Sequence, residues 1–338
     1  MPEMNNAATV KIVRFHQTGA ADVLQIDEMP LPEPGPGEIR LRVKAIGLNR
    51  AEVMFRMGQY LVAPKLPSKL GYEASGVVEA VGAGVDAAWV GKTVSTVPAF
   101  PADAYGVYGE VAIVPVEAVA EYPVTLSSEE GTSIWMQYLT AYGALVHYGK
   151  VTQGDFVLIT AASSSVGIAA IEIVKSEGGI SIATTRTSAK KEELLKLGAD
   201  FVIATEEEDL VARVQEITDG EGARVIFDPV GGPGLEKLAA VAAASGTIFE
   251  YGALATEATP FPLFAVLSKH LTVKGYTLFE VVGDPETRVV AEQYVFDRLR
   301  AGEFKPRIDR VFKGLESMVE AHRYMESNAQ VGKIVVTV

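Results

Sequence analysis

The stretch that decides the fold runs from Asp155 to Lys191 and reads DFVLITAASSSVGIAAIEIVKSEGGISIATTRTSAKK. It opens with a β-branched apolar run and continues with a turn of small residues at 161–167. Apolar residues then recur at helical spacing from 168 to 177, and a second apolar run follows. A strand, a tight turn, a helix and a second strand in this order predict the opening unit of a dinucleotide-binding fold.

The small residues of the turn suit the binding of a pyrophosphate. Phosphates bind to backbone N–H groups at a helix N-terminus, where the helix dipole favours an anion, and bulky side chains would hold them off. The usual G-x-G-x-x-G pattern is incomplete, because Ala162 and Ser164 replace its first two glycines and only Gly167 remains. Two interpretations stay open: a nucleotide site with added hydroxyls from Ser164 and Ser165, or an ordinary β–α turn.

The composition excludes several classes of function. The 338 residues suffice for two domains, and the net charge of −13 argues against nucleic acid or an anionic membrane as the main partner. The absence of cysteine excludes disulfides and thiolate metal sites. The segment 1–9 has no signal-peptide pattern and no apolar run reaches membrane length, so we expect a cytoplasmic location.

The residues before about 126 follow a β pattern. Short apolar runs broken by Gly and Pro, such as 38–43 and 74–78, predict a compact antiparallel, barrel-like domain. The prolines between Pro30 and Pro36 predict an extended connector. Only 49–57 interrupts the pattern, and we expect a helical turn there.

From Ser127 onward the pattern alternates between helices and strands. Helices are expected at 134–148, 190–197, 207–217, 233–243 and 315–325. Strands beyond the opening unit are expected at 201–204, 224–227, 247–251, 271–276 and 333–338. The two strands of the opening unit and the four strands from 201 to 276, with helical crossovers between them, predict a doubly wound parallel sheet of six strands. The helix at 315–325 and the strand at 333–338 are expected to pack back on the first domain.

Short motifs in a fixed order cover essentially the whole chain. They are Pro32–Glu38, Gly47–Arg50, Gly58–Tyr60, Gly71–Gly76, Gln137–Tyr142, Ala161–Gly167, Leu197–Asp200, Phe227–Gly232 and Gly332–Val335. By their order and spacing the chain resembles the medium-chain dehydrogenase/reductase superfamily, and within it the zinc-free quinone oxidoreductase branch.

The resemblance implies an α/β protein of two domains. Residues 1–126 and 305–338 would form a mainly antiparallel, β-barrel-like (GroES-like) catalytic domain, and residues 127–304 a doubly wound Rossmann domain. The cleft between them would hold the cofactor, since such sheets bind ligands beyond the C-terminal ends of their strands. In relatives the sixth strand, here 271–276, pairs across a two-fold axis, so a homodimer is expected.

Zinc-using relatives carry residues that this chain lacks. They have a cysteine in the segment matched by Asn49 and Arg50, a histidine at the position of Tyr72, and a loop of four cysteines, so no metal site is expected here. The resemblance implies metal-free hydride transfer from NADPH to quinones, enones and related activated double bonds. An acyl-thioester enoyl reductase and a non-catalytic relative that keeps the cofactor fold stay open as alternatives.

The resemblance also assigns site residues. Those implied in binding NADPH are Asn49, Thr140, Ser163, Ser164, Ser165, Val166, Thr185, Arg186, Lys190, Gly252, Ala253, Leu254, Phe279, Asn328 and Lys333. Asn49, Tyr60 and Thr140 are the candidate hydrogen-bond donors to an oxyanion formed in the reaction. Asn49 is equally suited to positioning the carboxamide of the nicotinamide.

The segment after the second strand sets the expected cofactor preference. Thr185, Arg186 and Lys190 would meet the adenosine 2′-phosphate, and no acidic residue stands at 184–188 to bind an unphosphorylated ribose. Quinone reductases carry a tyrosine where this chain has Thr205 and an arginine near Asn328, so the phosphate site is expected to depend mainly on Arg186. The alternative is that these basic residues form only a solvated helix face.

Overall fold

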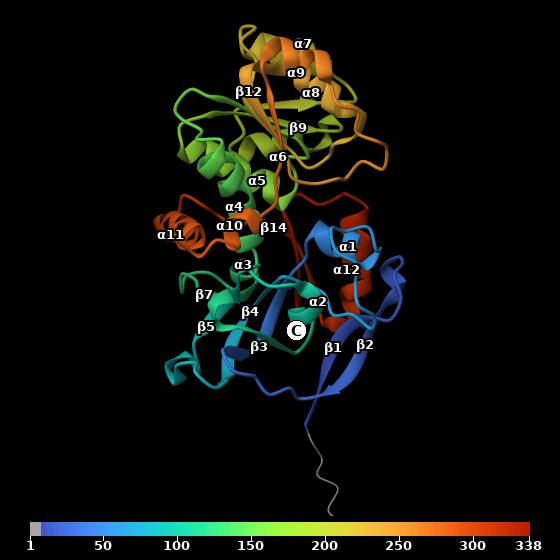
Figure 1. The fold of residues 1–338 in the computed structure, drawn as a ribbon, viewed down its shortest axis with the longest axis vertical. Helices are drawn as coiled ribbons and strands as arrows, with labels where there is room; N and C mark the ends of the chain where they lie inside the picture. Colours follow the sequence, from blue (N-terminus) through green and yellow to red (C-terminus); the bar gives the residue numbers. More distant parts are fainter. Residues whose placement is uncertain (1–7) are drawn as a thin grey trace, which may run out of the picture. The chain divides into compact units, whose positions relative to one another are not determined.

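The computed structural model describes residues 8–338 and divides the chain into two compact units (Figure 1). Unit 1 combines the N-terminal part, up to Met136, with Pro306–Val338, and unit 2 is the continuous segment Gln137–Lys305. The expected functional domains, with limits near residues 126 and 305, stay a prediction. The signal-peptide expectation concerns residues that lie mostly outside the described part.

Unit 2 is built on a six-stranded parallel sheet in the order β10-β9-β8-β11-β12-β13. Its strands are β8 (Phe156–Ile159), β9 (Ile180–Thr185), β10 (Phe201–Ala204), β11 (Ala223–Asp228), β12 (Ala242–Glu250) and β13 (Thr272–Gly275). Leu158 lies opposite Ile182 in β9 and Ile226 in β11, so β8 is central. The chain extends the sheet from β8 in both directions, which confirms the predicted doubly wound α/β class.

Helices precede, connect and follow these strands, and side-chain caps begin three of them. They are α4 (Trp135–Tyr142) with the π-helix η4 (Gly143–Tyr148), α5 (Ser165–Ser176), the 3-10 turn η5 (Ser188–Lys190), α6 (Lys191–Lys196), α7 (Leu210–Ile217), η6 (Gly232–Gly234), α8 (Leu235–Val241), α9 (Leu263–Lys269), α10 (Phe279–Val282) and α11 (Pro285–Ala301). The expected helix start at 207 is wrong, because Asp209 accepts a hydrogen bond from the Ala212 N–H at 2.9 Å and so caps α7 at Leu210.

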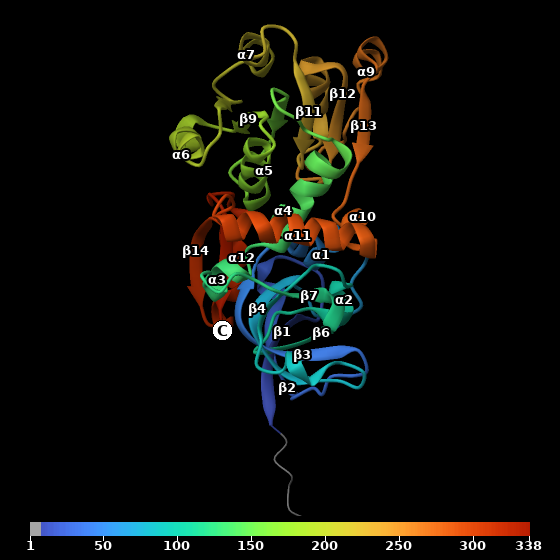
Figure 2. The same cartoon turned by 90° about the vertical axis from the view of Figure 1, so that its left-hand side faces the viewer.

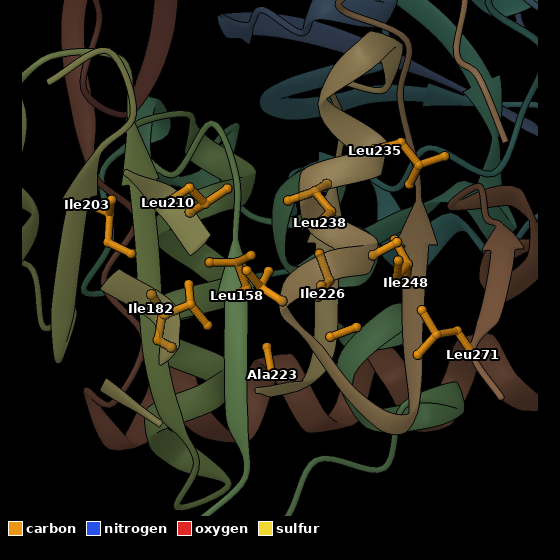
Figure 3. Packing of buried hydrophobic residues seen from close by; sticks show 14 residues of the cluster. Leu158, Ile182, Ile203, Leu210, Ala223, Ile226, Leu235, Leu238, Ile248 and Leu271 are labelled. Atoms are coloured by element: carbon orange, nitrogen blue, oxygen red, sulfur yellow. The ribbon is translucent and has the colours of Figure 1, made fainter. Parts of the chain in front are cut away.

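The core of unit 2 fills the space between the sheet and its helices. Figure 3 shows Leu158, Ile182 and Ile226 from three neighbouring strands packed with leucines of the helices. Burial of each large aliphatic side chain contributes roughly 1.5–3 kcal/mol relative to exposure. This packing fixes the positions of the strand ends, from which the loops considered below begin.

Unit 1 contains a two-stranded sheet and a seven-stranded sheet. The pair is β1 (Thr9–Phe15) with β2 (Leu24–Pro30). The larger sheet has the order β14-β15-β3-β4-β5-β7, with β6 also paired to β3. Its members are β3 (Glu38–Gly47), β4 (Glu73–Val81), β5 (Thr93–Thr96), β6 (Val111–Pro115), β7 (Val119–Glu121), β14 (Ile308–Lys313) and β15 (Lys333–Thr337).

Short helices complete unit 1, and the C-terminal segment joins its sheet. The helices are η1 (Ala21–Val23), α1 (Arg50–Arg56), η2 (Ala87–Trp89), α2 (Ala102–Tyr105), η3 (Val116–Ala118), α3 (Ser128–Gly131), η7 (Leu315–Ser317) and α12 (Met318–Glu326). Val335 in β15 lies opposite Gly47 in an antiparallel pair with β3. The last helix and strand therefore return to the first part of the chain, as predicted.

The strand β15 packs so closely against β3 that no side chain fits at Gly47. A Cβ atom there would lie 2.2 Å from the carbonyl oxygen of Thr132 and 2.8 Å from Cε of Lys333. Only glycine leaves room at this position for the lysine side chain that β15 brings beside β3.

Candidate functional site

The turn between β8 and α5 holds the α5 N-terminus close to the sheet. A Cβ atom on Gly167 would lie 2.6 Å from Cα and from the carbonyl oxygen of Ala162, so only glycine permits this approach. The Ser164 hydroxyl caps the helix by accepting a hydrogen bond from the Gly167 N–H at 3.0 Å. Within residues 8–338, the N–H groups of Ser165 and Val166 have no acceptor. The turn therefore presents two free donors at the positive end of a twelve-residue helix.

Basic side chains lie beside this turn and after β9. Lys190 donates a hydrogen bond from Nζ to Oγ of Ser163 at 3.2 Å, which brings a cation to the rim of the turn. The Arg186 side chain is exposed, and its guanidinium forms no hydrogen bond or ion pair with the described residues. Thr205 donates from Oγ1 to the carbonyl oxygen of Thr185 at 3.3 Å. Arg186 is thus a cation available to a ligand at the C-terminal end of β9.

The ends of β11 and β12 bring two carboxyl groups together. Asp228 and Glu250 lie opposite each other in the parallel register. Asp228 accepts hydrogen bonds from the Thr160 hydroxyl and from the Gly231 N–H, whereas both side-chain oxygens of Glu250 are buried without a donor among residues 8–338. Burial and then the neighbouring Asp228 raise the pKa of Glu250 to about 8.

The remaining predicted residues of unit 2 lie in three separate segments. Gly252, Ala253 and Leu254 are exposed in the loop after β12, which is held by a 3.0 Å hydrogen bond from the Leu254 N–H to the Pro229 carbonyl. Thr140 is buried within α4, and Phe279 is half-buried at the start of α10. The turn before α5, Arg186 and the 252–254 loop thus all lie at the C-terminal ends of the strands of this sheet. Thr140 instead lies buried in the helix α4.

In unit 1, one face of α1 buries polar side chains. Asn49, Glu52 and Arg56 recur at helical spacing, and their exposed fractions are 7%, 1% and 0%. Side chains of this kind are rarely buried unless they are paired. Arg56 forms an ion pair with Glu326 of α12, while its Nε and Nη1 atoms have no partner among the described residues.

Lys333 connects this face of α1 to β4 and β15. Its buried ammonium forms an ion pair with Glu73 and donates a 2.6 Å hydrogen bond to Oδ1 of Asn49. The amide nitrogen of Asn49 lies 3.2 Å from a Glu73 oxygen and 3.3 Å from a Glu52 oxygen. An ammonium on one side and two carboxylates on the other determine which atom of the amide is oxygen. Asn49 therefore directs its N–H groups to carboxylates inside unit 1.

Tyr60 and Asn328 lie nearer the surface of unit 1. The Tyr60 ring is half-buried, burial raises the pKa of its hydroxyl, and that hydroxyl makes no hydrogen bond with residues 8–338. Asn328 is exposed at a positive φ of 57°, and its side-chain oxygen accepts a hydrogen bond from the Arg50 guanidinium. Arg50 thus places a cation beside Asn328.

The sequence reasoning named Asn49 and Lys333 but missed Glu52, Glu73, Tyr108 and His322, which lie around them. The pattern Asn49-x-x-Glu52 is a capping box, which the structure forms with a 2.7 Å hydrogen bond from the Asn49 N–H to Glu52. That local signal was available in the sequence. Tyr108 and His322 had no such signal, since they reach the cluster from distant parts of the chain.

The described part of the chain offers neither a cluster of metal-binding side chains nor a membrane-spanning helix. Residues 8–338 contain no group of three or more His, Asp or Glu side chains arranged to hold a metal ion. None of the helices described there is both long enough and apolar enough to span a membrane.

Two family models match the chain. The model described as alcohol dehydrogenase GroES-like domain matches residues 35–124, and the model described as zinc-binding dehydrogenase matches residues 165–292. The second description names zinc, whereas this chain has no cysteine.

Curated relatives match over nearly the full chain. Quinone oxidoreductase 1 of Escherichia coli (strain K12) is 31% identical over 95% of this chain and 97% of the relative. The synaptic vesicle membrane protein VAT-1 homolog of Rattus norvegicus is 30% identical over 94% of this chain and 81% of the relative. The 2-haloacrylate reductase of Burkholderia sp is 30% identical over 95% of this chain and 97% of the relative. The crystal structure of Escherichia coli quinone oxidoreductase complexed with NADPH covers 97% of this chain and 100% of that chain, with a TM-score of 0.88 and 30% identity.

The Lys333–Glu73 pair makes a specific prediction about stability. Lys333→Met leaves the Glu73 carboxylate buried without its cation, and removal of one partner of such a pair costs about 3–5 kcal/mol. The double variant Lys333→Met/Glu73→Gln is expected to be clearly more stable than Lys333→Met, because no uncompensated charge remains. Urea unfolding followed by the fluorescence of Trp89 and Trp135, both in unit 1, measures the difference. An equal decrease in the free energy of unfolding in the single and the double variant would contradict the prediction.

The raised pKa of Glu250 predicts a pH dependence of unit 2. Because the folded-state pKa is about 8 and the unfolded value is about 4.3, the contribution of Glu250 to stability is fully present below about pH 4 and is lost as pH rises toward and through 8. Glu250→Gln should flatten the decline in melting temperature between pH 5 and 9, measured by calorimetry. Burial raises the pKa of the Glu292 carboxyl to about 7, so Glu292→Gln should flatten the decline in melting temperature only below about pH 7. A Glu250→Gln difference that is constant across this range would refute the assignment.

Proposed function

This chain belongs to the zinc-free quinone oxidoreductase branch of the medium-chain dehydrogenase/reductase superfamily, and on that premise we propose that it reduces quinones or activated C=C bonds with NADPH. The observation that carries the proposal is the turn before α5, with two free N–H donors, and the unpaired Arg186 after β9. Relatives described as a quinone oxidoreductase and as a 2-haloacrylate reductase support this class of substrate.

The residues of unit 2 fit the phosphates of NADPH. Gly167 gives the pyrophosphate room at the helix N-terminus, and the N–H groups of Ser165 and Val166 would bind it. The Arg186 guanidinium would bind the adenosine 2′-phosphate in a bidentate manner, and Lys190 would add a second positive charge. The loop 252–254 extends from the same end of the sheet and would contact the nicotinamide half. When bound, the cofactor supplies a hydride.

Transfer of hydride to an enone or a quinone leaves negative charge on the substrate oxygen. Hydrogen-bond donors that are not already engaged stabilise such a charge most effectively. Tyr60 fits this role, because its hydroxyl is uncommitted and its raised pKa keeps it protonated near neutral pH. Asn49 fits the positioning alternative better, because both of its N–H groups are directed at carboxylates. We therefore assign oxyanion stabilisation to Tyr60 and cofactor positioning to Asn49.

The reaction is tested by following NADPH oxidation at 340 nm with 1,4-benzoquinone, 2-cyclohexenone, crotonyl-CoA and acetophenone, next to NADP⁺-dependent oxidation of ethanol and 2-propanol. Turnover of the quinone or the enone above the rate without enzyme is expected, with little oxidation of alcohols. Activity confined to crotonyl-CoA would identify an acyl-thioester enoyl reductase. Good alcohol turnover without any quinone or enone reduction would overturn the proposal, and binding of NADPH without any turnover would favour a non-catalytic relative.

Arg186 predicts the cofactor preference. Wild-type protein should bind NADPH more tightly than NADH. Arg186→Ala should lower the ratio of the Kd for NADH to the Kd for NADPH by about ten-fold or more, since a hydrogen bond to a charged group contributes about 1.5–3 kcal/mol. Fluorescence titration of each cofactor measures both ratios. Arg213→Ala, which removes a half-exposed guanidinium paired to Glu208 and Glu216, is the control and should leave the ratio unchanged. Equal affinity of wild-type protein for both cofactors would contradict the role of Arg186.

We also propose a cytoplasmic homodimer formed through β13. This strand ends the sheet, and Figure 2 shows α9 next to it. Strand edges of this kind readily pair with another chain. Exposed apolar side chains on and before α9 add a contact surface; they are Phe261, Leu263, Phe264 and Leu267. Light scattering should give a dimer mass at micromolar concentration and a lower mass for Phe264→Glu, whereas a monomeric wild type would exclude the dimer.

A further inference from the structure

The Glu52 carboxylate is saturated with hydrogen bonds. Its Oε1 atom accepts from the Tyr72 backbone N–H at 3.0 Å and from the Asn49 amide at 3.3 Å. Its Oε2 atom accepts from the Asn49 backbone N–H at 2.7 Å and from the Tyr108 hydroxyl at 2.6 Å. A carboxylate offers about four lone-pair sites, and here each is used by one donor. Among the described residues the carboxylate thus joins α1, the segment before β4 and the loop before β6.

We propose that Glu52 is a positioning residue for the reduction reaction, which fixes the orientation of Asn49 and the backbone at Tyr72. This inference rests on the function proposed above, in which Asn49 positions the cofactor. Glu52 itself is buried, with an exposed fraction of 1%, and so offers no surface to a substrate. It acts through the two donors of Asn49, one from the main chain and one from the side chain.

The Asn49 amide is held from opposite sides. Glu52 and Glu73 receive its N–H groups, and Lys333 donates to its oxygen. Rotation of the amide by 180° would turn its oxygen toward two carboxylates and its N–H groups toward an ammonium. Each of these contacts would be repulsive, so the arrangement allows one orientation.

Tyr108 and His322 in turn hold the Glu52 carboxylate in place. Since Tyr108 gives its only proton to Glu52, the 3.2 Å contact between Tyr108 and His322 requires that Nε2 of His322 donates to the hydroxyl oxygen. Burial and then the charge of Arg56 lower the pKa of His322 to about 3, so the imidazole stays neutral in this role. The chain of bonds therefore runs from α12 through Tyr108 to Glu52 and Asn49.

A glutamine at position 52 has nearly the same shape but cannot accept the same bonds. Its amide nitrogen would face two of the four donors, and its single oxygen would serve the other two. Glu52→Gln should therefore release Asn49 without creating a cavity. The misplacement of a positioned group by about 1 Å can cost a hundred-fold in rate.

The test compares Glu52→Gln, Tyr108→Phe and the control Glu79→Gln, which removes a half-exposed carboxylate paired to Arg40 and Arg42 in the same unit. The readouts are kcat with 1,4-benzoquinone, Kd for NADPH and the melting temperature, with rates measured at a temperature where circular dichroism shows the variants folded. Glu52→Gln should lower kcat by about ten- to a hundred-fold while the Kd changes by less than about three-fold, because the phosphates are assigned to unit 2. Tyr108→Phe should lower kcat less, and Glu79→Gln should leave it unchanged.

The outcomes separate the inference from the function on which it rests. A folded Glu52→Gln with wild-type kcat, or with a lower melting temperature as its only change, would overturn the positioning role. If Glu52→Gln does not fold, the decrease of kcat in Tyr108→Phe decides the question, and an unchanged kcat there would also overturn it. A wild type that reduces none of the acceptors would instead refute the proposed function.

Discussion

The buried ion pair between Lys333 and Glu73 is the contact on which unit 1 depends. It joins the C-terminal strand to the start of β4 and orients Asn49 at the same time. Removing a charge pair from water is costly, and the interaction compensates only where every remaining donor and acceptor is satisfied. That requirement explains the surrounding set of polar residues. Asn49, Glu52 and the Met136 N–H, which donates to Glu73 at 2.9 Å, complete the hydrogen bonds of the two carboxylates and the ammonium.

The two units represent different physical solutions for a candidate site. In unit 2 the candidate site is built from the backbone: a glycine, a serine cap and two N–H groups without an acceptor among the described residues lie at a helix end. Unit 1 uses side chains whose charges are buried and mutually compensated. A backbone site depends only on local conformation, whereas a buried charge network depends on segments far apart in the sequence.

This difference explains what could be predicted from the sequence. The turn before α5 and the doubly wound sheet were predictable, because small residues between apolar runs act locally. The helix α11 was missed although Asp284 caps it and Pro285 begins it, since its exposed face obscures a regular apolar pattern. The strand β14 was missed because half of its residues are exposed and the residues that pair with it in β15 lie 24 or 25 positions later in the chain. The contacts of Tyr108 and His322 with Glu52 could not be predicted, because these residues come together only in three dimensions.

The discontinuity of unit 1 has a consequence for synthesis. Unit 2 is one continuous segment, whereas β15 leaves the ribosome only after all of unit 2 has been made. Domains generally fold as units during translation, at about 5–20 residues per second. Unit 2 can therefore reach its native state before Lys333 supplies the cation that pairs with Glu73. Until β15 is added, residues 45–47 of β3 lack their partner on one side and the Glu73 carboxylate has no cation. Transiently unpaired strand edges of this kind favour aggregation.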